Sequence, residues 1–97
     1  MPGAPATFVF DGVYVTQVHL YWEAPCERNG IITNYILTVF TGSIRRQTIT
    51  KKSNEHTHQV MALTPNTNYR FRLVARTSRG EGIPKVLEVK TKSVKSK

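Results

Sequence analysis

Several features that often decide the class of a protein are scarce or missing in this sequence. Among 97 residues there is one cysteine, Cys26, so no disulfide can form within the chain and packing alone must hold the fold. A domain without disulfides is compatible with oxidising and reducing compartments, so the cysteine count leaves the location open. No run of about 20 apolar residues occurs, so we expect no transmembrane helix and no direct insertion into a membrane.

The N-terminal segment MPGAPA lacks the apolar core of a secretory signal peptide. We expect Met1 to mark the start of a piece taken from a longer protein, with residues 1–4 as added or linker residues. A chain of this length fits one domain. Such a domain buries roughly 60–65% of the surface of its unfolded chain, which is enough to fold without cross-links.

Acidic residues are also few. The chain has 14 lysines and arginines against 6 aspartates and glutamates, a formal net charge of +8. An excess of this size favours polyanionic partners. Four of the cations, however, lie in the terminal segment KTKSVKSK (Lys90, Lys92, Lys95 and Lys97), and a lysine and serine tail of this kind is typical of a solvated linker.

No segment shows a helical period, whereas apolar and polar residues alternate with a period of two. The pattern is clearest in residues 68–76, where inward Tyr69 and Phe71 alternate with outward Arg70 and Arg72. Turn residues such as Asp11-Gly12 and Pro65-Asn66 separate the alternating segments. Seven segments fit short strands: 6–12, 15–22, 34–40, 45–50, 56–61, 68–76 and 86–91. The alternation and the spacing of the turns therefore predict an all-β, seven-stranded antiparallel immunoglobulin-like β-sandwich.

Five sequence segments together resemble the fibronectin type III domain: VHLYWEAP, NGIITNYIL, LTPNTNYRFRLVART, GEG and VKT. The resemblance runs over residues 5–91, which we take as the domain, with 92–97 as a basic linker tail. It implies one sheet of strands A, B and E and a second of strands C, C′, F and G. It also implies a tyrosine corner at Tyr69, whose ring packs inside while its hydroxyl bonds to upstream backbone. The expected structural core includes Trp22, Tyr35, Leu63, Pro65, Tyr69 and Phe71.

The sequence contains no catalytic constellation, and we expect neither an enzyme nor a bound cofactor. Its histidines test the case for a metal, because three ligands must converge on one point. His19 falls on the outward side of its strand, whereas His56 and His58 share the parity of inward Val60. We therefore expect no metal site. Cys26 follows Pro25 in a loop and is expected to be inert.

The segment TSRGEG, residues 77–82, resembles a loop in which some fibronectin type III domains carry Arg-Gly-Asp. Here the triplet is Arg79-Gly80-Glu81, whose longer acid would displace the oxygens that a metal-bound carboxylate site requires. Glycines are also what a tight turn between strands F and G needs. We expect a turn without integrin binding.

One face remains as a candidate site. Arginines interleaved with apolar residues are typical of protein interfaces, and the same cations, with Lys51 and Lys52, could bind heparan sulfate. The simpler interpretation is that arginine stems cover the sheet and pair across strands with residues such as Glu88. The face comprises Arg45, Arg46, Arg70, Arg72, Arg76, Ile36 and Phe40.

The resemblance implies a non-catalytic spacer and protein-interaction repeat in the extracellular part of a single-pass cell-surface protein, similar to repeats of receptor-type tyrosine phosphatases or usherin-like proteins. Its partners would be neighbouring domains and another protein, with no nucleic acid, and the isolated domain would be monomeric. One alternative is a heparan sulfate-binding module. The other is a cytoplasmic structural repeat of the kind found in giant muscle proteins.

Overall fold

The computed structural model describes residues 3–26 and 30–94, and every regular element in these ranges is a β-strand. None of the described residues forms a helix long and apolar enough to cross a membrane. The strands are β1 (Thr7–Val13), β2 (Val18–Glu23), β3 (Asn34–Thr41), β4 (Ile44–Lys52), β5 (Thr57–Val60), β6 (Asn68–Thr77), β7 (Gly80–Glu81) and β8 (Lys85–Lys90).

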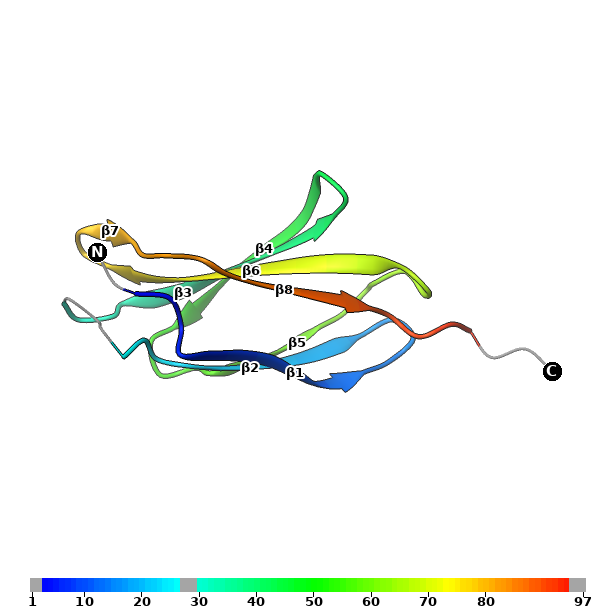
Figure 1. Ribbon diagram of the computed structural model, residues 1–97, viewed down its shortest axis with the longest axis horizontal. Helices are drawn as coiled ribbons and strands as arrows, with labels where there is room; N and C mark the ends of the chain where they lie inside the picture. Colours follow the sequence, from blue (N-terminus) through cyan, green and yellow to red (C-terminus); the bar gives the residue numbers. More distant parts are fainter. Residues whose placement is uncertain (1–2, 27–29, 95–97) are drawn as a thin grey trace.

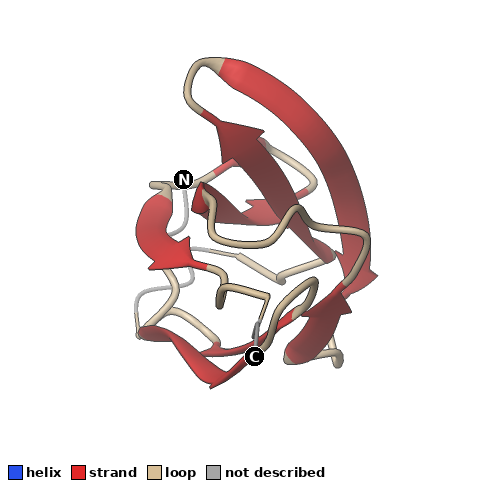
Figure 2. Ribbon diagram, turned by 90° about the vertical axis from the view of Figure 1, so that its right-hand side faces the viewer, coloured by secondary structure: helices blue, strands red, loops and turns tan. Residues whose placement is uncertain are grey.

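Two antiparallel sheets face each other (Figures 1 and 2). The smaller sheet has the order β1-β2-β5, and the larger has the order β4-β3-β6 with both β7 and β8 paired to β6. The predicted sandwich and its division into two sheets are confirmed. The eighth strand arises because the last predicted strand is preceded by a separate two-residue piece, β7. Pro84 lies between the two pieces and has no N–H to donate to a ladder.

The core lies between the sheets and is built around Trp22. Its neighbours on β2, Val18 and Leu20, are fully buried, as are Tyr35 on β3 and Phe71 on β6. The Trp22 ring lies 6.4 Å from that of Phe8 and 5.9 Å from that of Tyr35, between centroids, in edge-on and tilted geometries that aromatic rings favour. This cluster joins three strands from both sheets.

The connection from β5 to β6 carries the chain from one sheet to the other. Leu63 is buried there and Pro65 is half-buried. The Tyr69 hydroxyl accepts a hydrogen bond of 2.7 Å from the backbone amide of Thr64. This is the bond that a tyrosine corner makes, from a ring that is itself buried.

The outer face of the larger sheet departs from a simple alternation. Val74 and Thr38 have outward parity, yet they are 1% and 8% exposed. Val74 is paired with Ile36 on β3 and is flanked along β6 by Arg72 and Arg76. Long neighbours of this kind shield the centre of the sheet from water.

Candidate functional site

The predicted face lies on the outer side of the larger sheet, where β3 and β6 run side by side. Phe40 is its aromatic centre, with Arg45 opposite it on β4 and Arg70 opposite it on β6. The Arg70 guanidinium carbon lies 5.2 Å from the Phe40 ring centroid, within cation–π distance. Its Nη2 donates to the carbonyl of Gly42 at 3.4 Å. These contacts position the Arg70 head over the β3–β4 turn.

The other two β6 arginines extend the face toward the opposite end of the molecule. Arg72 is half-buried opposite Thr38, and Arg76 is exposed opposite Asn34. Ile36 is half-buried between these two rows. Successive outward residues on one strand lie about 6.8 Å apart, so the β6 arginines form a line of cations rather than a cluster.

The two β4 arginines occupy a β-bulge. Gln47 pairs with Val39 and Arg45 pairs with Phe40, so Arg46 is the extra residue. Its Nε donates to Thr41 Oγ1 at 2.7 Å, which directs the side chain along the β3–β4 hairpin. Both arginines are exposed. A bulge commonly re-aims side chains in this way.

No carboxylate in the described part of the chain forms an ion pair with an arginine of this face. Within the described ranges the ion pairs are His19 with Asp11 and Lys51 with Glu55, and neither includes an arginine. Glu88 stands opposite Arg70 in the β6–β8 register, but no ion pair joins them. Fixed cations without neutralising partners leave a positive potential over the sheet.

Two of the acidic side chains are held on the other sheet. Asp11 is hydrogen-bonded to His19. Glu23 accepts 2.9 Å hydrogen bonds from the hydroxyls of Thr7 and Tyr21, which lower the pKa of its carboxyl. These two carboxylates therefore lie away from the arginine face.

The lysines grouped with the arginines from the sequence do not share one position. Lys51 is paired with inward Tyr35, and its Nζ donates to His58 Nδ1 at 3.3 Å. Burial lowers the pKa of the His58 imidazole, and the charge of Lys51 lowers it further. Lys52 is exposed, and its backbone amide donates to Glu55 Oε1 at 2.7 Å, which lowers the pKa of that carboxyl. Lys51 thus belongs to the side of the sandwich between β4 and β5.

The histidines lie in three different surroundings. His19 is half-buried on β2 beside Asp11, His58 is on β5, and the His56 ring lies 5.8 Å from Tyr35 between centroids. In the part of the chain that the structure describes, no three His, Cys, Asp or Glu side chains form a group that could hold a metal ion. Cys26 is an exposed free thiol.

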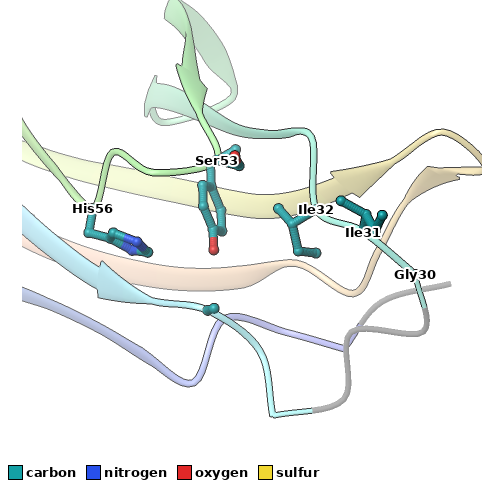
Figure 3. Close-up of a pocket in the computed structure, with 7 residues that line it drawn as sticks. Gly30, Ile31, Ile32, Ser53 and His56 are labelled. Atoms are coloured by element: carbon teal, nitrogen blue, oxygen red, sulfur yellow. The ribbon is translucent and has the colours of Figure 1, made fainter.

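A pocket of about 290 Å³ opens at the end of the sandwich where the β2–β3 and β4–β5 connections meet (Figure 3). The close-up places Ile31 and Ile32 on one side and His56 on the other. Ile31 is 85% exposed. The lining residues are Ala24, Gly30, Ile31, Ile32, Tyr35, Ser53 and His56.

Residues 77–82 form a tight hairpin at that same end. Thr77 pairs with Gly80, so Ser78 and Arg79 make the tip. Gly80 has a φ of +125°, which favours glycine, and the Arg79 amide donates to Thr77 Oγ1 at 3.2 Å. The predicted turn is present. The absence of integrin binding stays a prediction.

Comparisons with known proteins give one consistent result. The family described as "Fibronectin type III domain" matches residues 3–92. A sidekick homolog of Caenorhabditis elegans is 34% identical over 98 residues, which cover 98% of this chain and 4% of that protein. Rat neural cell adhesion molecule L1 is 31% identical over 86 residues, 84% of this chain and 7% of its own. A Lar-like tyrosine-protein phosphatase of Caenorhabditis elegans is 32% identical over 92 residues, which cover 84% of this chain and 4% of that protein.

The solved structures show the same fold. Domains d3–d4 of the rat CD45 extracellular region superimpose with a TM-score of 0.84 at 22% identity, covering 93% of this chain and 49% of that one. The chain spans only 4–7% of the length of the relatives named above.

Proposed function

The chain belongs to the fibronectin type III family, and from that premise we propose that it is a non-catalytic spacer and protein-interaction repeat. Its place would be the extracellular region of a multidomain cell-surface receptor or adhesion protein. The similarity to an adhesion molecule and to a tyrosine-protein phosphatase supports this proposal. An enzyme domain elsewhere in the parent chain is compatible with it.

The spacer role rests on how the two ends of the domain are placed. The described ends lie at opposite poles of the sandwich (Figure 1), and the ten residues of β6 alone span about 33 Å. The C-terminal end is fixed by its backbone, because Lys92 donates to the carbonyl of Tyr14 and accepts from the amide of Asn66, both at 3.0 Å. Thr91 adds a 2.6 Å hydrogen bond from its hydroxyl to the carbonyl of Thr64. A neighbour attached here would leave at a defined position.

The spacer role can be tested by measuring the distance between the poles. Spin labels on cysteines introduced at Ala6 and Ser93, in a Cys26→Ser background, should give one narrow distance distribution. Thr91→Val removes the hydroxyl that bonds to Thr64, so it should broaden that distribution. A broad distance distribution in the labelled domain that keeps Thr91 would contradict a rigid spacer.

The arginines without carboxylate partners favour a second candidate function, binding of heparan sulfate. Such binding should weaken steeply with salt, because each neutralised anionic group releases counterions. Elution from heparin can be compared between a chain truncated after Lys92 and the double variant Arg70→Ala, Arg72→Ala. A site on the sheet survives truncation and is lost in the double variant, whereas retention by the tail shows the reverse. We expect modest retention carried mainly by the tail.

A further inference from the structure

The outer edge of β4 lies next to the arginine face. We propose that the free edge of β4 accepts an extended acidic segment of a protein partner as an added strand. The inference deepens the proposed interaction role by naming the surface and the chemistry of the partner. It rests on the backbone of β4 and on its distribution of charge.

Strand β4 is an edge strand of the larger sheet. It pairs with β3 on one side, and no strand among the described residues pairs with its other side. Lys52 shows which backbone groups face that free side: its amide donates to Glu55 Oε1 and its carbonyl accepts from the amide of Glu55. Both polar groups of Lys52 therefore point away from β3.

Pairs in an antiparallel ladder alternate, so every second residue directs its N–H and C=O to the same side. Thr50 and Thr48 stand two and four residues before Lys52, in unbroken register with β3. Their backbone groups therefore face the free edge, and both residues are exposed. The bulge at Arg46 ends the regular edge on one side. The outward groups of Lys52 are already bonded to Glu55 at the other end, so residues 47–51 remain open to pairing.

The charged side chains on β4 itself are all positive, while the carboxylate of Glu55 is bonded to Lys51 and Lys52 at the end of the strand. Arg45 and Arg46 precede the free edge, Lys51 and Lys52 end it, and no acidic residue occurs between positions 41 and 54. A second copy of β4 paired antiparallel about Thr48 would set Arg45 against Lys51, and like charges facing each other across strands repel. Edges protected in this way resist self-association. An acidic strand would instead place its carboxylates opposite these arginines and lysines, and the opposite charges would attract.

Backbone pairing separates this proposal from binding of a polysaccharide. An extended peptide gains affinity from main-chain hydrogen bonds along a sheet edge, and heparan sulfate offers no matching alternation of N–H and C=O groups. Of the other outer strands, β5 has four residues, β8 has six and carries charges of both signs, and β1 is interrupted by an irregularity between Phe10 and Gly12. Strand β4 is longer and carries charge of one sign.

The test uses a synthetic peptide, acetyl-EETVTVTEE-amide, titrated into the isotopically labelled domain. We expect amide hydrogen exchange of Thr48 and Thr50 to slow by about tenfold or more at saturation, because their N–H groups become paired. Thr48→Pro removes one outward N–H, a change that edge strands tolerate. It should weaken binding by about tenfold.

Two controls make the outcome decisive. The peptide acetyl-KKTVTVTKK-amide should not bind, and the double variant Arg70→Ala, Arg72→Ala should bind the acidic peptide nearly as well as the parent. If Thr48→Pro fails to fold, the exchange measurement on the parent protein decides. Binding that leaves Thr48 and Thr50 unprotected, or that the double variant abolishes, overturns the proposal in favour of the sheet face. Absence of binding at millimolar peptide also overturns it, and the pole-to-pole distance still tests the spacer role independently.

Discussion

The ten residues of β6 build two faces of different character. On the inner side Tyr69, Phe71, Leu73 and Ala75 are all buried, between 0% and 5% exposed, against the opposite sheet. On the outer side the alternate positions are Asn68, three arginines and Val74. The inner face has its partner within the domain. The outer face is covered by the stems of its own side chains, and no ion pair among the described residues joins its charged heads to a carboxylate.

The difference shows where stability and recognition are located. An apolar residue between two sheets loses all contact with water and touches both layers, so its removal leaves a cavity. An outward arginine keeps its head in solvent and contributes little to folding. Its charge is available to a partner. Val74 is the exception, because it faces outward and is still buried.

The largest expected effect is on the inner face. Phe71→Ala should reduce the free energy of unfolding by about 3–5 kcal/mol, because a fully buried ring is replaced by a cavity. Arg72→Ala, one position along, is the matched control and should reduce it by only about 1 kcal/mol, because it removes a half-buried stem that covers Val74 and leaves the core filled. Urea unfolding followed by Trp22 fluorescence measures both. Similar losses of unfolding free energy in the two variants would show that the inner and outer faces contribute equally to stability.

Val74→Ala tests the exception. The substitution removes two carbon groups from a site that is 1% exposed, so we expect a loss of about 2 kcal/mol. That is about twice the loss expected at Arg72. A loss below about 0.5 kcal/mol would show that the covering side chains do not exclude water.

The sequence predicts the inner face well, because alternation and large apolar residues determine which positions face the other sheet. The tyrosine corner is also confirmed, down to the hydroxyl bond between Tyr69 and Thr64. Alternation does not predict that Val74 and Thr38, which face outward, are buried. Their burial depends on which strands become neighbours and on how far Arg72 and Arg76 lie across them.

The candidate site is predictable only in part for the same reason. The parity of Arg70 and Arg72 follows from the β6 pattern, but the stacking of Arg70 on Phe40 depends on the register between β3 and β6. Lys51 was grouped with the arginines from its charge. Its inward parity depends on how β4 pairs with β3, which a single strand does not reveal. The sequence predicts only a turn at the short strand β7, since two residues carry no alternation.

A smaller effect is expected from removing one hydroxyl at the start of β6. Tyr69→Phe keeps the buried ring and loses the acceptor for the Thr64 amide, so the free energy of unfolding should fall by about 1 kcal/mol. Urea unfolding of this variant beside Phe71→Ala separates the hydroxyl from the packing of the inner face. No loss at all would mean that water replaces the hydroxyl at no cost.

The smallest effect is expected where an inward position on the other sheet is not apolar. His58 is paired with Leu20 on β2, and burial holds the pKa of its imidazole below the ordinary value, with Lys51 and His19 acting in the same direction and Glu55 opposing them. A histidine whose pKa is lower in the folded state binds fewer protons folded than unfolded. Its contribution to stability is therefore complete above the unfolded pKa of about 6.5 and is lost as the pH falls through the folded value.

His58→Gln removes this titration and keeps a polar side chain. Between pH 7 and pH 5 the urea midpoint of the parent should fall relative to that of the variant, because proton uptake by His58 ends its hydrogen bond from Lys51 and sets two cations side by side. The rest of the sequence is the same in both proteins, so the difference between the two midpoints isolates the effect of His58. Parallel pH profiles would show that the half-buried histidine is as well solvated as an outward side chain. Inward and outward side chains would then be equally solvated at this edge of the sandwich.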